Sequence, residues 1–285
     1  MKITVEALKD FLECPRKYYY RHVKKEEWLF LNGGEKNNPK GLEEKFEQDL
    51  HKVFYYLFHS IQDNKYPSVY LLRKRWGAIW CREKTIEDVL MNTSKHMLVR
   101  RKEAESDVEK LELLGVDAID KMHQFFDKKH GVPLLVGKRV NVKIGHHEVD
   151  AIIDLVRETE KDDKKIIEVM DFRTDIKLRQ YAHQRPLDLH IDHDIGLTLA
   201  SLGFYQLTHV EPENLTYYLV LRNGTYSTQR TKHQYRELYE ILNMVEKAIQ
   251  NEIYYPVYHA HCYDCPFSHL CQHGKVVRMN DEDCE

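Results

Sequence analysis

The sequence has no hydrophobic run long enough to cross a membrane. A transmembrane helix needs about 20 apolar residues in succession, and no segment of these 285 residues approaches that length. The first residues, MKITVEALKDFLECPRK, also lack the apolar core of a secretory signal peptide. Internal repeats and low-complexity tracts are missing as well. We therefore expect a globular protein with no membrane partner that works in the cytoplasm, or in the host cell cytoplasm if the protein is viral.

An excess of positive charge is missing too. The chain carries 43 lysine and arginine residues against 46 aspartate and glutamate residues, a formal net charge of −3. A nucleic-acid partner would therefore have to be bound by local basic runs such as LLRKRW and VRRK. The hydrophobic share of 42% and the charged share of 31% are typical of a soluble protein, and the length allows one or two domains.

Cysteine is scarce, and half of it is concentrated in one place. Three of the six cysteines, Cys262, Cys265 and Cys271, lie within ten positions after a long stretch without any. Such a cluster in a long chain favours metal ligation in a reducing compartment over a disulfide framework. Three thiolates leave a tetrahedral site one ligand short. His269 and His273 flank the last of these cysteines and offer substitute ligands.

Helical periodicity dominates the first half of the chain. Residues 4–24 predict a helix with Thr4 as its N-cap, interrupted or restarted at Cys14-Pro15. Apolar residues then recur at helical spacing from about residue 41 to residue 130. We expect this half to consist of helices that pack through their apolar stripes.

The pattern changes after residue 130. Residues 138–171 alternate between apolar and polar, which predicts two or three antiparallel strands around the turn RETEKDDKK. A helix is predicted over about 187–203, ending at Gly203. Asn223-Gly224 predicts a hairpin, and residues 232–252 predict an amphipathic helix. The fold class is therefore α+β or α/β, with a helical front half, a small mixed sheet and a cysteine-bearing tail.

Two carboxylates are predicted to face each other across the first hairpin. Asp154 lies about eight residues before the centre of the turn and Asp171 about nine after it. Because two such acids repel each other unless a cation is present, the pair favours a divalent metal site. Ordinary strand-edge acids held by turns and solvent would have the same pattern. Asp150 shares a strand face with Asp154 but lies too far from the turn to oppose Asp171 in a simple hairpin.

Histidines provide weaker candidates. His146 and His147 lie beside Asp150, but consecutive strand residues point to opposite faces, so at most one of them would face the acids. A second group has the spacing of one helix face and could hold metal or phosphate: His190, His193 and Asp194. With 17 histidines in the chain, a plain surface location explains these residues equally well.

Four segments resemble the PD-(D/E)xK nuclease superfamily, in its RecB-like branch. IIDLV and VMDFRTD are similar to the second and third motifs of that branch, an Asp paired across a hairpin with an Asp-aromatic segment. KGLEEKFEQDLHKVF resembles its first motif, a helix ending in a metal-binding histidine. LKDFLECPRKYYYRHV, together with the terminal cysteines, resembles the iron–sulfur group of these nucleases, which includes the CRISPR-associated Cas-four nucleases and the AddB subunit of helicase–nucleases.

The resemblance implies a restriction-endonuclease-like fold, with a mixed β-sheet core, an N-terminal helical region and a C-terminal iron–sulfur tail. It divides the chain into an N-terminal helix with the first cluster cysteine over 1–35, a helical region with the motif histidine over 36–135, the nuclease core over 136–255 and a cluster-binding tail over 256–285.

The resemblance also implies the missing sulfur ligand. In the iron–sulfur group one cysteine far upstream joins three at the C-terminus, so the implied ligands of a 4Fe-4S cluster are Cys14, Cys262, Cys265 and Cys271. Soft thiolates alone fit zinc equally well. The basic residues that follow Cys14 would then lie along a DNA backbone: Arg16, Lys17 and Arg21.

A second, harder metal site is implied in the sheet. Its ligands would be His51, Asp154, Asp171 and the backbone carbonyl of Phe172, which would hold Mg²⁺ or Mn²⁺ and so activate a water for attack on a phosphodiester.

The chain departs from the family pattern next to this site. The lysine expected two residues after the second acid is Arg173, which stays charged and cannot exchange a proton near neutral pH. Lys177 is the alternative amine, and Asp150 is the alternative acid. The glycine before the second-motif Asp and the Gln-x-x-x-Tyr helix of the branch are also missing, which indicates a divergent member.

The implied activity is that of a metal-dependent DNA exonuclease on single-stranded DNA or DNA ends. Its partners would be DNA and a helicase, an integrase or other recombination or replication proteins. Because of Arg173, the alternative is a catalytically impaired subunit that uses the nuclease fold to bind DNA or to assemble with partners. A zinc-stapled protein without a nucleic-acid role is the third alternative.

Overall fold

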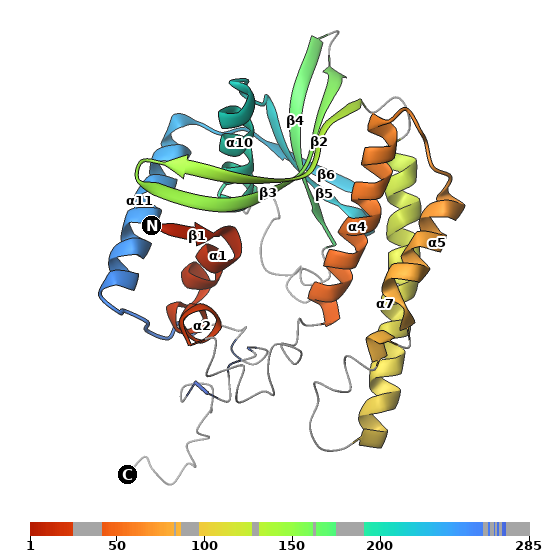
Figure 1. The fold of residues 1–285 in the computed structure, drawn as a ribbon, viewed down its shortest axis with the longest axis horizontal. Helices are drawn as coiled ribbons and strands as arrows, with labels where there is room; N and C mark the ends of the chain where they lie inside the picture. The colour runs from red at the N-terminus through yellow and green to blue at the C-terminus, as the bar shows by residue number, and fades with distance from the viewer. Residues whose placement is uncertain are drawn as a thin grey trace, which may run out of the picture.

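The protein is built around a six-stranded mixed sheet with helices on both sides, as the computed structural model in Figure 1 shows. The structure describes residues 1–24, 42–82, 84–86, 97–126, 131–161, 164–174 and 191–258, together with residues 262, 265, 267, 270 and 271. The expected fold class, a mixed sheet of the restriction-endonuclease-like kind with a helical front, is confirmed.

The long strand β3 (His147–Lys161) organises the sheet. Along one edge it pairs antiparallel with β2 (Val132–Ile144). Its other edge pairs in parallel with β1 (Lys2–Thr4) near the start and antiparallel with β4 (Lys164–Arg173) near the end. The prediction of antiparallel strands over residues 138–171 is therefore confirmed, with the first strand beginning earlier than expected.

The predicted hairpin around Asn223-Gly224 extends the sheet beyond β4. Strand β5 (Asn214–Leu219) pairs in parallel with β4, and β6 (Gly224–Thr228) pairs antiparallel with β5. A 3-10 turn over Val220–Arg222 leads into Asn223, whose φ of 50° lies in the left-handed region that asparagine tolerates. The local turn chemistry thus defines this connection.

Two short helices follow β1 at the N-terminus. Thr4 caps α1 (Val5–Glu13), and its hydroxyl accepts a hydrogen bond of 3.1 Å from the backbone N–H of Ala7. The chain is extended at Cys14, the residue before a proline, where helical geometry is disfavoured. It then forms α2 (Pro15–Tyr18) and a π-helical turn over Tyr19–Val23. The predicted interruption at Cys14-Pro15 is confirmed.

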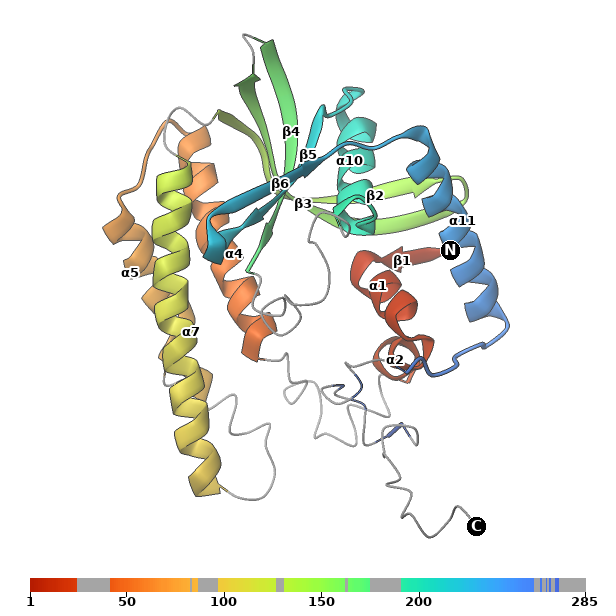
Figure 2. The same ribbon diagram turned by 180° about the vertical axis from the view of Figure 1, so that it is seen from behind.

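Three long helices cover one face of the sheet: α4 (Leu42–Gln62), α5 (Val69–Trp80) and α7 (Met97–Phe125). They lie together in both views (Figures 1 and 2). Their apolar stripes bury a core that includes Phe46, Phe54, Phe58, Trp76, Trp80, Met122 and, from the sheet, Leu155 and Phe172. The predicted helix packing through apolar stripes is confirmed.

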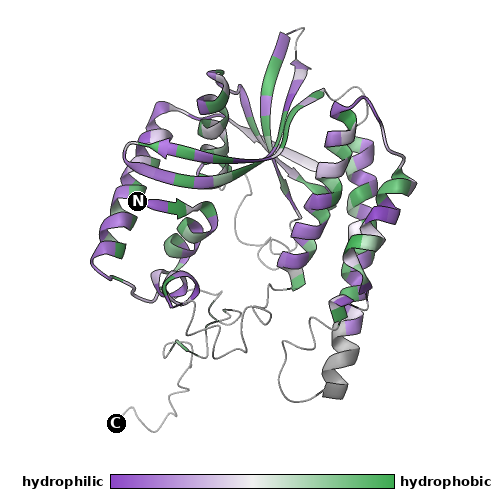
Figure 3. Ribbon diagram, viewed as in Figure 1, coloured by the Kyte–Doolittle hydropathy of each residue, from purple (hydrophilic) through white to green (hydrophobic). Residues whose placement is uncertain are grey.

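The other core joins the opposite side of the sheet to α1, α10 (Ile195–Thr208) and α11 (Lys232–Gln250). Figure 3 shows apolar and polar residues alternating along the strands, as expected where one face of a strand packs against a core. The amphipathic helix predicted over 232–252 is α11. None of the helices in the described part of the chain combines the length and hydropathy that a bilayer crossing requires.

The prediction of a helix ending at Gly203 is wrong. Helix α10 begins at Ile195, because Asp194 caps it, and ends at Thr208, where His209 takes the left-handed φ of 58°. Gly203 lies inside the helix, and a Cβ there would come within 2.8 Å of the side chain of Val140 in β2. The glycine therefore allows the helix to approach the sheet and does not end it.

Candidate active site

The two predicted acids lie next to each other across the β3–β4 hairpin. Leu155 pairs with Met170, so the same register carried one step further sets Asp154 opposite Asp171. Both acids line a cleft of about 720 Å³. The cleft is bordered by α1, α4, the sheet and the start of α10, and its lining includes His51, Asp154, Asp171, Phe172 and Arg173.

Helix α4 supplies two side chains that hold Asp154. Tyr55 donates a hydrogen bond of 2.5 Å to Oδ1 of Asp154, and Nδ1 of His51 lies 3.6 Å from the same oxygen. The backbone N–H of Phe172 donates to Oδ2 at 3.0 Å. The other ring nitrogen of His51, Nε2, lies 3.2 Å from the carbonyl oxygen of Phe172. The His51 imidazole therefore lies against both the Asp154 carboxylate and the Phe172 carbonyl.

These contacts shift the pKa values of Asp154 and His51. Burial by itself would raise the pKa of Asp154, but the charge of His51 and the hydroxyl of Tyr55 hold it well below the ordinary value of 3.8. Burial by itself would lower the pKa of His51, but the charge of Asp154 raises it to about 9. In the absence of a metal, His51 is therefore protonated at neutral pH and forms an ion pair with Asp154.

The pKa of Asp171 shifts in the opposite direction to that of Asp154. Burial raises its pKa to about 7; the cation of Arg173 opposes this shift, and the nearby Asp154 charge adds to it. The guanidinium of Arg173 lies 2.6 Å from Oδ2 of Asp171 and 4.8 Å over the ring of Tyr217. Its Nε is buried and has no hydrogen-bond partner in the structure. Arg173 therefore remains charged, with donors directed at the second acid.

Sequence reasoning missed Lys9, which lines the cleft, and did not connect Asp194 with it. Asp194, the N-cap of α10, lies 3.6 Å from Arg173 and 3.4 Å from the amine of Lys9 in α1. Burial would raise the pKa of Asp194, but Lys9 and Arg173 lower it to about 2. A Cβ on Gly196 would lie 2.9 Å from the Lys9 amine, so this glycine leaves room for it. The cap could be read from Asp194 before an apolar run, whereas no local signal links Lys9 to the acids.

The donor set fits the divalent cation that the sequence predicts. One imidazole, two carboxylates and a backbone carbonyl are mostly hard oxygen ligands, which Mg²⁺ and Mn²⁺ prefer. These ligands would be His51, Asp154, Asp171 and the carbonyl of Phe172. Deprotonation of His51 and exchange of the Arg173 ion pair at Asp171 would accompany binding.

The structure brings Cys14 to the C-terminal cysteines. The backbone N–H of Val257 lies 3.4 Å from Sγ of Cys14, and Sγ of Cys262 lies 3.6 Å from the carbonyl oxygen of Val257. Burial raises the pKa of Cys265, and the neighbouring Cys14 and Cys262 add to the shift. Cys14 and Cys262 therefore both contact the backbone of Val257.

The fourth cysteine of the predicted set, Cys271, is fixed within the same C-terminal segment. The backbone N–H of Cys271 donates to Phe267 at 2.9 Å, and the Tyr20 hydroxyl donates to the carbonyl of Leu270 at 3.0 Å. The ring of Tyr20 stacks on Phe267. The five cysteines that the structure describes are all free thiols, so the donor chemistry suits a soft metal or an iron–sulfur cluster. His269 and His273 lie outside the described residues.

Two of the three predicted DNA-binding cations have acidic partners. Lys17 lies 2.9 Å from the buried Asp10, and Arg21 also lies 2.9 Å from it. Burial would raise the pKa of Asp10, but its hydrogen bond with His22 and these cations lower it. Lys17 and Arg21 still line the cleft. Arg16 lies at a separate surface hollow.

The alternative acid does not join the group. Asp150 is exposed at the border of the cleft and accepts a hydrogen bond of 2.7 Å from Asn141. Lys177 lies outside the described residues. The predicted helix face of His190, His193 and Asp194 is wrong, because Asp194 is an extended N-cap and His193 lies in the turn before it. His190 lies outside the described residues.

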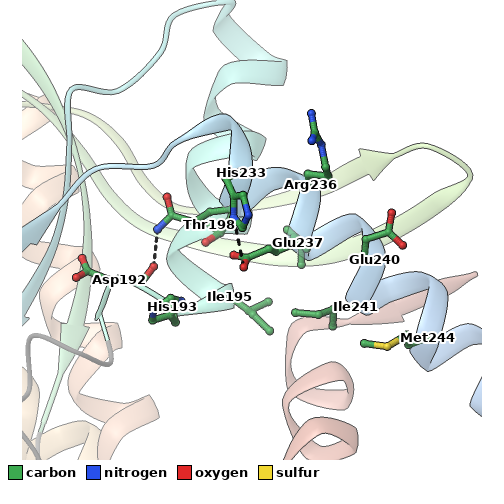
Figure 4. A pocket seen from close by; sticks show the side chains of 12 residues that line it. Asp192, His193, Ile195, Thr198, His233, Arg236, Glu237, Glu240, Ile241 and Met244 are labelled. Atoms are coloured by element: carbon green, nitrogen blue, oxygen red, sulfur yellow. Dashed lines mark hydrogen bonds and ion pairs between the residues drawn. The ribbon is translucent and has the colours of Figure 1, made fainter.

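His193 borders a separate groove of about 520 Å³ between the start of α10 and helix α11 (Figure 4). Polar groups there are paired with one another, as in the 3.3 Å contact between His233 and Glu237. The groove also exposes Met244. It has none of the converging acids that define the first cleft.

Comparison with known proteins agrees with this geometry. Residues 2–272 match the family described as the PD-(D/E)XK nuclease superfamily. No curated protein matches the chain. The match extends over the acid pair of β3 and β4, the histidine helix α4 and both cysteine-bearing ends. The chain belongs to the PD-(D/E)XK nuclease superfamily.

Proposed function

We propose that this protein is a metal-dependent DNA exonuclease of the RecB-like, iron–sulfur group, acting on single-stranded DNA or DNA ends. The observation that carries the proposal is the meeting of His51, Asp154 and the Phe172 carbonyl in one cleft with Asp171. A Mg²⁺ or Mn²⁺ ion held there would supply Lewis-acid polarisation of the phosphodiester and activation of a water. A helicase or an integrase would be the partner that delivers DNA ends.

Each residue of the cleft has a separate task in this proposal. Tyr55 and the Phe172 N–H fix the carboxylate of Asp154 in one orientation, so the ligand is preorganised. Arg173 gives up Asp171 when a cation binds, and its free donors then hold a phosphate oxygen. Because arginine keeps its charge, it stabilises negative charge but moves no proton.

Lys9 supplies the missing amine. Its ammonium and Arg173 flank the same carboxylate of Asp194, and its charge lowers the pKa of Asp171, so it lies within electrostatic reach of the acid pair. A lysine amine can position a water and exchange a proton with it, which arginine cannot. Lys9 is therefore our candidate, among the described residues, for the part of the amine.

Cleavage of end-labelled DNA tests the proposal. Asp171→Ala and Asp154→Ala are expected to lower cleavage by about 100-fold or more, since each removes a ligand of the cation. Asp150→Ala, which removes an exposed acid of the same strand, is the matched control and is expected to keep full activity. Full cleavage by the Asp171→Ala protein would exclude the proposed site.

Substrate form tests the exonuclease assignment. Linear single strands and duplexes with free ends are expected to be degraded progressively, while closed circles of the same sequence persist. RNA of the same sequence and length tests whether the protein distinguishes ribose from deoxyribose. Rapid cutting of closed circles would change the assignment to an endonuclease.

One observation favours the impaired subunit as a second candidate. Arg173 already neutralises Asp171, and protonated His51 already neutralises Asp154, so the acids are satisfied without a cation. This candidate predicts DNA binding without cleavage under Mg²⁺ or Mn²⁺ for any end structure. Arg173→Lys separates the two, because gain of Mn²⁺ binding and cleavage only in that variant would establish the impaired state.

A further inference from the structure

The turn between β2 and β3 packs closely against helix α11. Gly145 in this turn has a φ of 59°, and a Cβ there would lie 2.7 Å from the ring of Tyr239 in α11. The next two residues are His146 and His147, so both imidazoles lie at the contact between turn and helix. The tip of the β2–β3 hairpin lies beside α11 in Figure 1. This contact is separate from the cleft that holds the acid pair.

A carboxylate of α11 lies against the histidines. Oε2 of Glu246 is 2.7 Å from Nε2 of His146, and its other oxygen, Oε1, is 2.9 Å from the amino group of Met1. The rings of His146 and His147 are tilted by 40° to each other, with 3.9 Å between their centroids. One ligand atom from each of His146, His147 and Glu246 lies within 4.8 Å of the other two.

His147 presents a buried nitrogen without a partner. The residue is 0% exposed, and its Nε2 lies 3.0 Å from Oδ1 of Asn243. Because an amide oxygen only accepts hydrogen bonds, Nε2 carries the proton, which leaves Nδ1 with a lone pair. That Nδ1 is buried and has no hydrogen-bond partner in the structure. A histidine whose second nitrogen is fixed by a neighbouring oxygen is the usual state of a metal ligand.

We propose that His146, His147 and Glu246 form a second metal site that binds a divalent transition metal of the zinc class. Two imidazoles and one carboxylate suit Zn²⁺ far better than Mg²⁺, which takes oxygen ligands. Three protein ligands leave one position of a tetrahedral ion for water.

Metal binding requires the ligand atoms, which now lie within 4.8 Å of one another, to adjust. Tetrahedral ligands about 2.0 Å from zinc lie about 3.3 Å apart, so the 2.7 Å contact between His146 and Glu246 must widen. His146 can move, because 57% of its side chain is exposed. The metal would replace the proton now shared between these two groups, and it would pin the β2–β3 hairpin to α11.

Zinc titration of the full-length, metal-stripped chain against a competing chelator tests this site. The variants are His146→Ala and Glu246→Gln, and the matched control is His233→Ala, which breaks an exposed His–Glu pair elsewhere on α11. All of these proteins keep the cysteines and the acid cleft, so zinc bound there cancels in the comparison. Circular dichroism checks that each variant is folded.

We expect both site variants to bind one zinc fewer than the wild type, or to bind that zinc at least tenfold more weakly, while His233→Ala binds as the wild type does. Because Glu246→Gln also loses the contact to the Met1 amine, His146→Ala carries the main comparison. Equal stoichiometry and affinity in all four proteins would overturn the proposal.

Ring-nitrogen spectra of ¹⁵N-histidine-labelled protein give a second readout. Zinc is expected to shift Nδ1 of His147 while Nε2 keeps its proton. Zinc binding that leaves the His147 ring unchanged would overturn the assignment even if the stoichiometry falls. Neither result depends on DNA cleavage, so the failure of this site leaves the nuclease proposal intact.

Discussion

At the residue scale, the structure sorts two chemically identical carboxylates into different protonation states. Asp154 receives hydrogen bonds from Tyr55 and the Phe172 N–H and lies beside protonated His51, so its pKa is low. Asp171 is buried next to that charge, and its pKa is raised to about 7 even with Arg173 beside it. His51 and Asp171 therefore carry protons that a cation must displace.

We expect Mn²⁺ binding to release about one proton or more per ion at pH 7.5, because His51 titrates at about 9 and Asp171 at about 7 in the metal-free protein. Both pKa values are raised, so protons compete with the cation on the acid side and affinity should rise from pH 6.5 to pH 9. Titration calorimetry in two buffers of different ionisation enthalpy measures the release. His51→Ala should remove most of it at pH 8; no release from the wild type would contradict the assigned ligands.

Lys9→Met is expected to lower kcat by about 100-fold with a smaller effect on KM, since the amine acts on the reacting water and not on DNA affinity. Lys9→Arg keeps the charge near Asp194 but cannot exchange a proton, so it should stay impaired. Steady-state cleavage over a range of pH measures both variants, and Lys2→Met in β1 is the control. Wild-type rates in Lys9→Met would remove this residue from the mechanism.

At the scale of elements, a glycine in α7 allows close packing against α5, whereas a glycine in α5 does not serve packing. Gly115 in α7 faces the indole of the buried Trp76, and an added Cβ would lie 2.3 Å from a ring atom. Gly77 in α5 is exposed and has nothing within 4 Å of such a Cβ. The same residue type thus has opposite roles in two neighbouring helices.

Alanine substitution should separate these roles. Gly115→Ala is expected to lower the free energy of unfolding by about 1–3 kcal/mol, because the ring of Trp76 must shift within a packed core. Gly77→Ala is expected to raise it by up to about 1 kcal/mol through helix propensity. Urea denaturation of both variants provides the comparison. Stabilisation of similar size in both would mean that α5 and α7 do not pack as described.

At the scale of the whole molecule, the structure brings the segment after α11 to the N-terminal helices. The segment after α11 contacts Cys14 through Val257, and its Tyr255 carbonyl accepts from the N–H of Arg16 at 3.3 Å. A metal or cluster held there would close a very long loop, and its binding energy would become folding energy. The division of the chain at residues 35, 135 and 255 stays a prediction.

Cys14→Ser is expected to abolish the broad visible absorbance of an iron–sulfur cluster in anaerobically purified protein and to lower the unfolding temperature. Cys81→Ser is the control, since Cys81 is exposed at the C-terminal end of α5 and is not among the predicted ligands. Metal analysis separates iron from zinc. A Cys14→Ser protein with an unchanged spectrum would show that Cys14 is not a ligand. A colourless wild-type protein that contains zinc would show that the cysteines hold zinc in place of an iron–sulfur cluster and still link the two segments.

The features that could be predicted from the sequence are those set by neighbouring residues. Thr4 as a cap, the break at Cys14-Pro15, the turn at Asn223 and the strand alternation all came from local chemistry. The facing positions of Asp154 and Asp171 followed from the length of one hairpin. The helix end assigned to Gly203 was wrong, because its cause is the contact with Val140 in a distant strand.

The sequence by itself determined the helices, the hairpins and the residue types available for metal binding, because these depend on propensities and periodicities over a few positions. Only the tertiary structure decided that Lys9 meets Asp194 and that His147 lies between Asn243 and the ring of His146. Lys9 and Asp194, for example, are 185 positions apart in the chain. Such contacts exist only after the sheet and its two cores have packed, so no local pattern can encode them.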